Sequence, residues 1–296
     1  MLSNPSLPLG SEFHPIIHAD KFSTSESLRL ADFAVAALIE EAMPTPKPAL
    51  VDTRGSGAHR DLDLRKLIGS AHALHGAFFE MAMRSVARVP DQELREELAM
   101  LGRSGEVQML RATGGSNAHR GAIWVLGLLI AGFASAGADA TPREMVRTAG
   151  DIAAWPHRSA PIEESNGIRA SKRYEVRGAR GEAIAGFPHV IDVGLPALWA
   201  ARARKIPEDS ARLDALMAIM MTLDDTCLLH RGGLDALESA RQSACEVLAA
   251  GGSSTREGRA ALLALDARLK RLKASPGGCA DLLAACLFID RLTSQG

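Results

Sequence analysis

Two polar turns of the sequence each carry a His-Arg pair beside glycine and lead into an apolar stretch. They are residues 51–63, which contain His59, and residues 113–121, which contain His119. If a helix follows each turn, its first backbone N–H groups are free and carry a partial positive charge. Helix starts of this kind bind anions. The two turns therefore predict an anion-binding site to which several loop-to-helix junctions contribute.

Similar polar corners recur along the chain, between most of the apolar stretches. They are Lys47 to Asp63, Asn117 to Arg120, Arg177 to Glu182, Asp224 to Gly233, and Ser275 to Asp281. Glycine lets a backbone approach phosphate oxygens, and a neighbouring arginine or lysine neutralises their charge. We expect these corners to fold together around one polyphosphate.

Two pairs of carboxylates lie within these corners, Asp61 with Asp63 and Asp224 with Asp225. Paired carboxylates suit a hard cation such as Mg²⁺, which proteins usually hold together with substrate phosphates. Each pair also has a simpler explanation, because an aspartate can cap a helix start or face solvent at a helix end. The sequence does not decide which pair would hold the metal.

The predicted polyphosphate site lacks the common sequence motifs of nucleotide-binding proteins. The chain contains no G-x-x-x-x-G-K-[ST] loop and no G-x-G-x-x-G turn after a strand, which are the common phosphate-binding motifs. From the residues alone, the interpretation is a nucleoside triphosphate site built from scattered loops.

Composition narrows the class of protein. The chain has 296 residues, a net charge of −1 and 47% apolar residues, enough for one or two domains and without an electrostatic case for nucleic acid. The four cysteines form no C-x-x-C pair, which is typical of free thiols in a reducing cytoplasm. No signal peptide is evident, and the uncharged stretch 121–138 is better explained as a buried helix than as a membrane anchor.

The elements that must position these corners are predicted to be helices. Aromatic residues make up only 4% of the chain, alanine and leucine dominate, and no alternating strand pattern occurs. We expect an all-α fold of about nine to eleven helices, with residues 1–22 as a loosely ordered arm and 23–296 as a single catalytic domain. The expected helices are 23–42, 61–87, 90–102, 106–111, 122–138, from 141, 188–205, 207–229, 234–250, 255–274 and 279–292. Residues 155–187 are expected to form a long active-site loop with one short helical piece at 179–185.

Seven ordered blocks, spread over residues 25–292, resemble the triphosphoribosyl-dephospho-CoA synthase family. The blocks are Pro46-Lys47-Pro48 with Val51-Asp52, Gly57 to Asp63, Asn117 to Gly121, Gly178 to Ala183 with Gly186-Phe187-Pro188, Asp225-Thr226, His230 to Gly233, and Ser275 to Ala284. The resemblance implies a transferase that joins ATP to 3′-dephospho-CoA and releases adenine. Its product, 2′-(5″-triphosphoribosyl)-3′-dephospho-CoA, would pass to an acyl-carrier-protein phosphoribosyl transferase. The turn at 113–116 favours the malonate decarboxylase branch over the citrate lyase branch.

The resemblance also implies roles for individual residues. The leaving adenine needs a proton, the attacking hydroxyl needs a base, and the developing sugar cation needs a carboxylate. Residues expected in catalysis are His59, His119, Glu182 and Asp225. Residues expected to bind phosphates are Lys47, Asn117, Arg120, Arg180, Arg231, Gly232 and Gly233. Residues expected to hold Mg²⁺ are Asp61, Asp63, Asp224 and Asp225.

The sequence departs from the family pattern at Ala49, Arg54 and Ala118, where glycine, asparagine and threonine are usual. Two rival functions stay open. One is a Mg²⁺-dependent all-α hydrolase, although a prenyl-diphosphate enzyme would need DDxxD and the chain has leucine at the fifth position, Leu228. The other is a non-catalytic nucleotide or CoA sensor. No nucleic acid or membrane partner is expected, and a homodimer is possible.

Overall fold

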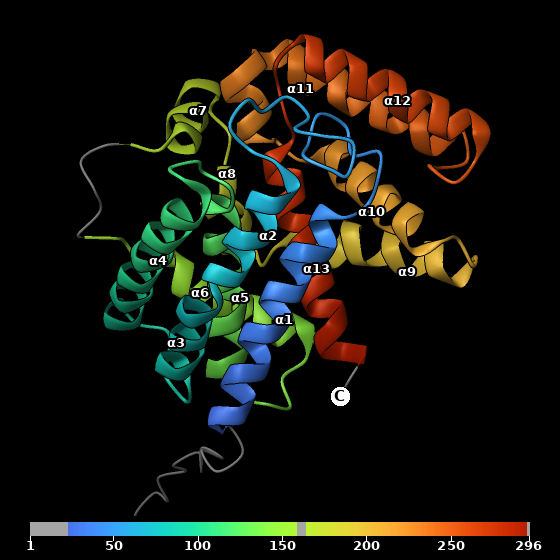
Figure 1. Ribbon diagram of the computed structural model, residues 1–296. Helices are drawn as coiled ribbons and strands as arrows, with labels where there is room; N and C mark the ends of the chain where they lie inside the picture. The colour runs from blue at the N-terminus through green and yellow to red at the C-terminus, as the bar shows by residue number, and fades with distance from the viewer. Residues whose placement is uncertain (1–22, 159–163, 295–296) are drawn as a thin grey trace, which may run out of the picture.

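The computed structural model describes residues 23–158 and 164–294 (Figure 1). Within these ranges the protein consists of helices and connecting loops, with no β-strand. The predicted all-α class is therefore confirmed. The predicted arm, residues 1–22, lies outside the described residues.

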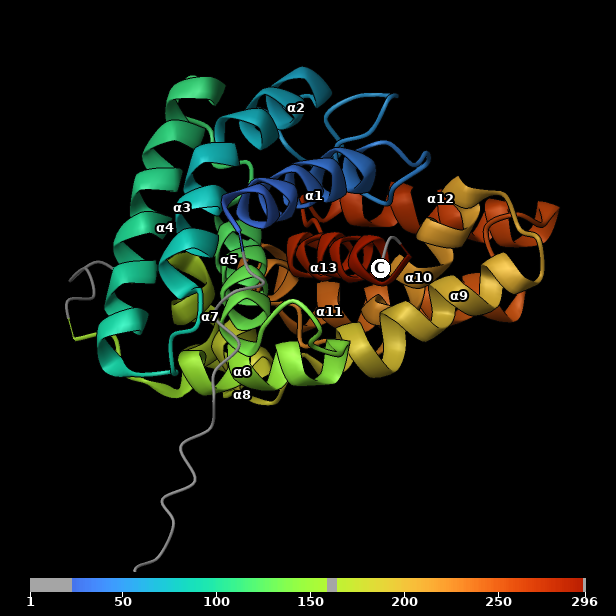
Figure 2. The ribbon, with the colours of Figure 1, turned by 90° about the horizontal axis from the view of Figure 1, so that it is seen from below.

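Two helices occupy the centre of the molecule, α5 (Arg120–Ala136) and α13 (Gly277–Ser294), and the others surround them (Figure 2). Both are apolar on nearly every side, as expected for helices that other helices cover. Glycine lets α5 approach its neighbour α6 (Pro142–Ala154) closely, because a Cβ at Gly132 would lie 2.4 Å from the carbonyl oxygen of Met145. The predicted buried helix after residue 121 is thus the core of the fold.

Most of the surrounding helices contact one of these two directly, and the rest pack on those neighbours. One side is formed by helices from the first half of the chain, α1 (Thr24–Ala42), α2 (Leu64–Ala73), α3 (His75–Ser85) and α4 (Gln92–Thr113). The rest is formed by α7 (Asn166–Tyr174), α8 (Gly178–Ile184), α9 (Leu195–Ala203), α10 (Glu208–Thr222), α11 (Thr226–Ala249) and α12 (Arg256–Arg271) together with α6.

Local sequence signals explain most helix starts. Ser23 caps α1 by accepting the N–H of Glu26, and Thr141 forms a reciprocal capping box with Glu144 at α6. Both were predicted from the spacing of these residues. The end of α1 at Ala42 also agrees with the prediction, since the prolines that follow cannot continue a helix.

Several boundaries differ from the prediction. The expected helix 61–87 is broken at Leu74 into α2 and α3, whereas the expected pieces 90–102 and 106–111 form the single helix α4. The stretch 188–205 begins as a π-helix, η2 (His189–Gly194), before α9. The expected helix 207–229 is divided between α10 and α11 at residues 223–225. The predicted break at the glycine pair is confirmed, because Gly233 has a non-helical backbone, with φ 68° and ψ −161°, and two helical stretches meet there in a kink within α11. Packing against neighbours overrides local helix signals at these positions.

One helix was missed. Residues 155–187 were predicted to be a loop with a helical piece at 179–185; α8 confirms that piece, but α7 also lies in this segment. Only Ala170 of α7 is buried. Most of its residues are polar or charged, so the segment resembles a loop in composition, and the cap at Ser165 was the clearest local signal of a helix.

Among the described residues, no single helix is both long and apolar enough to cross a membrane. The stretch Gly178–Ile184 with His189–Ala203 meets the length and composition criterion only as a pair, and the two parts meet at a 78° bend.

Candidate functional site

Four of the predicted corners meet where α5, α11 and α13 begin, beneath the loop of residues 43–63 at the top of Figure 1. The Nε2 atom of His59 lies 3.0 Å from the Oγ of Ser275. The Oγ of Ser116 donates to the carbonyl of Asp61 at 2.8 Å. A Cβ on Gly121 would lie 1.9 Å from Oδ2 of Asp281. We call Lys47, His59, His119, Asp225 and Asp281 the inner cluster.

Lys47 is a buried cation, exposed to only 1%. Its ammonium donates to the Oε1 atom of Glu41 at 2.6 Å and to the carbonyl of the same residue at 2.9 Å. A buried charge is tolerated only when it is paired and hydrogen-bonded. Lys47 therefore has internal partners. Its positive charge also lowers the pKa of His59 and His119.

The loop that carries Lys47 is held by charged hydrogen bonds. Asp52 accepts the backbone N–H of Lys47 at 2.9 Å and the guanidinium of Arg54 at 2.7 Å. Arg54 also contacts Asp266 of α12 at 3.1 Å, and Asp266 accepts the N–H of Ala49 at 2.8 Å. Thus Ala49 and Arg54, two of the departures from the family pattern, are joined to α12 through one carboxylate.

His59 is held neutral. Burial lowers its pKa most, and the charge of Arg231 lowers it further, to about 4. Since the side chain is only partly covered, it remains in reach of a ligand at the surface of the loop. At neutral pH the imidazole is uncharged and can accept or donate a hydrogen bond.

His119 is more deeply enclosed, with 5% exposure. Its Nδ1 lies 2.7 Å from the Oγ of Ser70 on α2, while Nε2 is buried and has no hydrogen-bond partner among the described residues. Burial and, secondarily, the charge of Lys47 lower its pKa to about 4. An orphaned buried nitrogen is uncommon in folded proteins and often marks a functional position.

Asp225 joins the starts of two helices. Its Oδ1 accepts the N–H groups of Cys227 and Leu228, which begin α11, at 2.7 and 3.2 Å. Its Oδ2 accepts the N–H of Cys279 in α13 at 2.9 Å. Burial raises its pKa despite these donors. Both oxygens are thus used within the protein, so Asp225 acts as a double helix cap.

Asp281 lies next to Asp225 and faces the start of α5. Burial raises its pKa well above the usual range, and the charges of Asp225 and Glu41 raise it further, while the N–H of Ala122 lowers it. The side chain keeps some contact with solvent. Because a nearby negative charge favours the protonated form of a carboxyl group, Asp281 gives up its proton less readily than an exposed aspartate.

The predicted free N–H groups at the start of α5 are largely occupied. The N–H of Arg120 donates to Oδ1 of Asn117 at 3.1 Å, and Ala122 faces Asp281. The guanidinium of Arg120 is turned to Glu106, with Nε 3.0 Å from Oε2. The prediction of an open anion site at this helix start is wrong, because the chain caps these donors with its own side chains.

The corner around Arg177 to Glu182 has a different character. Glu182 is 8% exposed and accepts from the backbone N–H and from Nδ1 of His189, at 2.9 and 2.8 Å. The Glu182 hydrogen bond raises the pKa of His189. Arg180 donates to the carbonyls of Ala153 and Ala154, where α6 ends. We call Arg180, Glu182 and His189 the α8 corner.

The four predicted metal ligands are not brought together. Asp63 caps α2 by accepting the N–H of Lys66 at 2.8 Å, and Asp224 is paired with Arg241 at 2.7 Å. Within residues 23–158 and 164–294, no three His, Cys, Asp or Glu side chains are arranged to hold a metal ion. Of the four, Asp61 is exposed and its carboxylate has no hydrogen bond or ion pair with the described residues. It is the one that could reach a cation brought in by a ligand.

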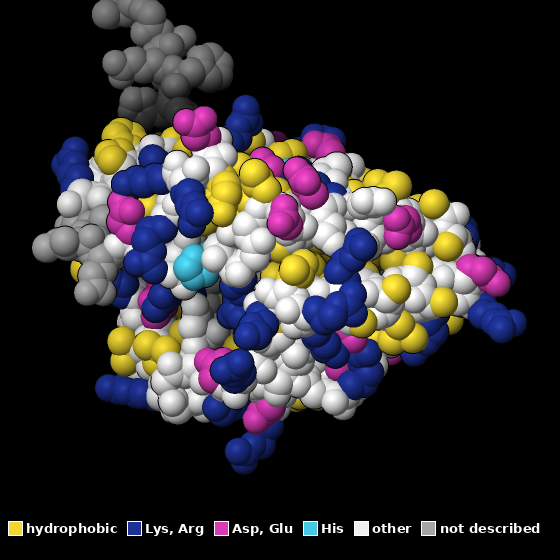
Figure 3. Space-filling view, turned by 90° about the horizontal axis from the view of Figure 1, so that it is seen from above, with side chains coloured by type: hydrophobic (Ala, Val, Ile, Leu, Met, Phe, Trp, Pro, Cys, Tyr) yellow, Lys and Arg dark blue, Asp and Glu magenta, His cyan; other side chains and the backbone are white. Residues whose placement is uncertain are grey.

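Arg231, Gly232 and Gly233 form the bend of α11 beside the inner cluster. The exposed Arg231 is close enough to affect the pKa of both His59 and Cys227. A Cβ on Gly232 would lie 3.3 Å from the Cβ of Ala274, so glycine lets the bend pack against the chain that enters α13. Lysine and arginine side chains are prominent on this face of the molecule (Figure 3).

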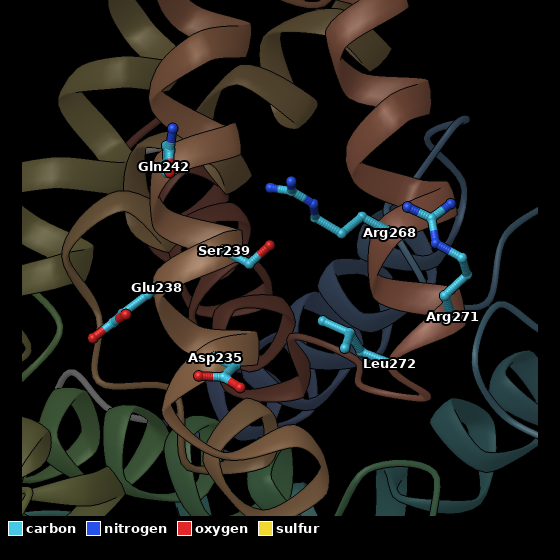
Figure 4. A pocket seen from close by; sticks show the side chains of 7 residues that line it. All are labelled: Asp235, Glu238, Ser239, Gln242, Arg268, Arg271 and Leu272. Atoms are coloured by element: carbon cyan, nitrogen blue, oxygen red, sulfur yellow. The ribbon is translucent and has the colours of Figure 1, made fainter.

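A hollow of about 500 Å³ extends between α11 and α12 from the bend (Figure 4). Its lining residues are Asp235, Glu238, Ser239, Gln242, Arg268, Arg271 and Leu272. Arg268 points across the hollow toward α11, whereas Glu238 points away from it. Neither Arg268 nor Arg271 has an ion pair or side-chain hydrogen bond in the described part of the chain. The hollow can therefore accept an anionic group.

Three polar residues of the site were not singled out as functional by sequence reasoning: the buried Glu41 and Ser70, and the partly buried Asp281. Asp281 lay in a noted polar corner, and its position in the first turns of the helix that follows Pro276 was the available signal. Glu41 and Ser70 lie inside predicted helices, where a polar residue on the apolar face was the only hint. Only their tertiary partners distinguish them.

Comparisons with known proteins identify the family of the chain. Residues 27–296 match the CitG family model, described as ATP:dephospho-CoA triphosphoribosyl transferase. The 2-(5″-triphosphoribosyl)-3′-dephosphocoenzyme-A synthase of Klebsiella pneumoniae is 52% identical over 263 residues, 89% of this chain and 94% of that protein. A probable synthase of the same name from Azotobacter vinelandii is 53% identical over 267 residues, covering 89% and 91%. No solved structure matches the chain. The protein belongs to the ATP:dephospho-CoA triphosphoribosyl transferase family.

Proposed function

We propose that this protein transfers the triphosphoribosyl group of ATP to 3′-dephospho-CoA. The observation that carries the proposal is the 52% identity to a curated synthase over 94% of its length. In the reaction, the ribose 2′-hydroxyl of dephospho-CoA attacks the anomeric carbon of ATP. The carbon–nitrogen bond to adenine breaks, adenine keeps the electron pair and gains a proton, and the attacking hydroxyl loses one.

The inner cluster supports this chemistry through its buried acid and base groups. Asp281 is the member best suited to exchange a proton, because its pKa is raised by burial and by Asp225, and it keeps some solvent contact. We assign it the proton that the departing adenine needs. Asp225, whose oxygens accept three backbone N–H groups, would hold the helix starts and supply negative charge near the sugar cation.

Phosphate binding falls to the cations at the open side of this cluster. Arg231 is exposed beside His59, and the hollow between α11 and α12 adds Arg268 and Arg271. We propose that the triphosphate lies near Arg231 and that the diphosphate of dephospho-CoA extends into the hollow. Mg²⁺ would arrive with the phosphates of ATP, and Asp61 would be its contact from the protein.

The product would pass to an acyl-carrier-protein phosphoribosyl transferase in the cytoplasm. The glycine-bearing turn at residues 113–116 favours the malonate decarboxylase branch over the citrate lyase branch. Purified enzyme from the candidate downstream step, supplied with each apo carrier protein in turn, would distinguish the branches.

Adenine release, followed by chromatography, tests the central proposal. The protein is incubated with MgATP, with and without 3′-dephospho-CoA, and the product mass is measured. We expect adenine and the triphosphoribosyl adduct only when both substrates are present. ATP binding without adenine would favour a sensor, and phosphate release without adenine would favour a hydrolase. Unchanged release in Asp225→Ala and His59→Ala would remove these residues from the mechanism.

A further inference from the structure

The contact between Ser70 and His119 joins a helix interior to the inner cluster. Ser70 is fully buried on α2, and its Oγ lies 2.7 Å from Nδ1 of His119. This distance is typical of a strong neutral hydrogen bond. Because α2 and the start of α5 come from separate parts of the chain, the contact is tertiary and fixes the direction of the imidazole ring.

The direction of the proton in this contact follows from what each atom can do. Within the described residues, Nδ1 of His119 is the only hydrogen-bond partner of the Ser70 hydroxyl. If Nδ1 were the donor, the hydroxyl hydrogen would be left without an acceptor in the interior, which is unfavourable. The hydroxyl therefore donates to Nδ1, and the single proton of the neutral imidazole is on Nε2.

The Nε2–H group then has nothing to donate to. Nε2 is buried without a partner among the described residues, and the Lys47 ammonium nearby cannot accept a hydrogen bond. The other polar contact of this residue, from its backbone N–H to Sδ of Met109 at 3.1 Å, orients the main chain and leaves Nε2 unused. A buried donor without a partner is suited to an acceptor atom of a ligand.

We propose that Ser70 holds His119 as the Nε2–H tautomer, so that His119 donates a hydrogen bond to an acceptor atom of the bound substrate and does not serve as a base. Ser70 is then a positioning residue. The substrate half of this inference rests on the proposed function, whereas the tautomer half concerns the free protein. The acceptor is a phosphate or ribose oxygen or a purine nitrogen, all of which share this chemistry.

Nitrogen-15 NMR of histidine-labelled protein tests the tautomer without any activity, because protonated and unprotonated ring nitrogens have well-separated shifts. The His119 signals are assigned by their loss in His119→Gln. We expect Nε2 to carry the proton in the wild type and a mixture of tautomers in Ser70→Ala. A proton on Nδ1 in the wild type would overturn the inference.

Ser85→Ala provides a matched control. Ser85 is also fully buried, but its hydroxyl donates within its own helix to the carbonyl of Met81 at 2.8 Å. This variant loses the same group, and we expect it to leave the His119 signals unchanged. If both serine variants disturb His119 equally, general loosening of the core explains the effect and Ser70 has no special role.

Separate additions of MgATP, inorganic triphosphate and adenine test the substrate half. A shift of the Nε2–H signal with triphosphate identifies a phosphate oxygen, one with adenine alone identifies a purine nitrogen, and one with MgATP alone identifies the ribose. No shift with any probe means that Nε2–H serves no substrate. We also expect kcat for adenine release to fall about tenfold or more in Ser70→Ala, whereas Ser85→Ala stays near the wild type.

Discussion

The inner cluster and the α8 corner each combine histidine with an acidic and a basic side chain but differ in how their polar groups are satisfied. In the α8 corner, Glu182 is held by His189 and Arg180 by two helix-end carbonyls. In the inner cluster, His119 keeps an orphaned Nε2, and Asp281 has a pKa raised well above its usual range. Saturated polar groups stabilise the fold, whereas the unsatisfied ones retain the capacity to act on a ligand.

Asp224 and Asp225 show the same contrast in adjacent residues. Asp224 is exposed and paired with Arg241, while Asp225 is buried at the junction of α11 and α13. Their side chains leave the backbone in different directions just before α11 begins. A pair of neighbouring carboxylates in the sequence is therefore not one metal-binding pair in the fold.

The largest effect is expected from removing the titratable proton of the inner cluster. Asp281→Asn should lower kcat for adenine release by about 10²- to 10⁴-fold, the range for a general acid, with little change in the thermal unfolding midpoint. Glu182→Gln in the α8 corner is the matched control and should release adenine at close to the wild-type rate. If Glu182→Gln lowered kcat more than Asp281→Asn, the α8 corner and not the inner cluster would carry the proton transfer.

Lys47→Met should destabilise the protein by about 3–5 kcal/mol, because it leaves the Glu41 carboxylate buried without its partner. Urea unfolding measures this change. The double variant Lys47→Met with Glu41→Gln should recover most of the loss, since no uncompensated charge remains. If it does not, packing of the lysine stem rather than charge pairing determines the stability of this contact.

Acid should weaken the fold through His119. The folded protein keeps this imidazole neutral down to about pH 4, whereas an unperturbed histidine takes up its proton near 6.5. Stability is therefore complete above pH 6.5 and falls by about 3 kcal/mol as the pH drops to 4. The buried carboxyls have raised pKa values and act in the opposite sense, so the test is the difference between wild type and His119→Gln. Equal pH slopes for the two proteins would show that His119 is not held neutral.

Replacing both Arg268 and Arg271 by alanine should raise the KM for 3′-dephospho-CoA about tenfold, equivalent to about 1.4 kcal/mol, and leave the KM for ATP unchanged. Steady-state kinetics with each substrate varied in turn measures this effect. Arg256→Ala and Arg259→Ala, at the far end of α12, are the charge-matched controls. If the KM for ATP rises instead, the assignment is reversed: ATP binds in the hollow and dephospho-CoA near Arg231.

The smallest effect is expected in the α8 corner. Arg180→Ala removes hydrogen bonds to the carbonyls at the end of α6 and should cost about 1 kcal/mol of stability. Adenine release measured well below the unfolding temperature should not change. A large loss of kcat without loss of stability would return Arg180 to the phosphate-binding residues.

The sequence by itself determined the helical class, the buried helix α5 and the caps at Ser23 and Thr141, because these depend on composition, on apolar periodicity and on residues three positions apart. It also indicated which loops carry candidate binding residues, because glycine stands next to charged residues there. These signals are local, so they survive without knowledge of the fold.

Only the tertiary structure decided which of those corners act together. The junction of α11 and α13 brings Asp225 to Cys279, 54 residues apart, and α2 brings Ser70 to His119, 49 residues apart. Burial at such contacts fixes the protonation of His59, His119 and Asp281. Desolvation and the charges of residues distant in the sequence cannot be inferred from local residue spacing. The sequence could therefore identify these titratable side chains but not the direction in which their pKa values shift.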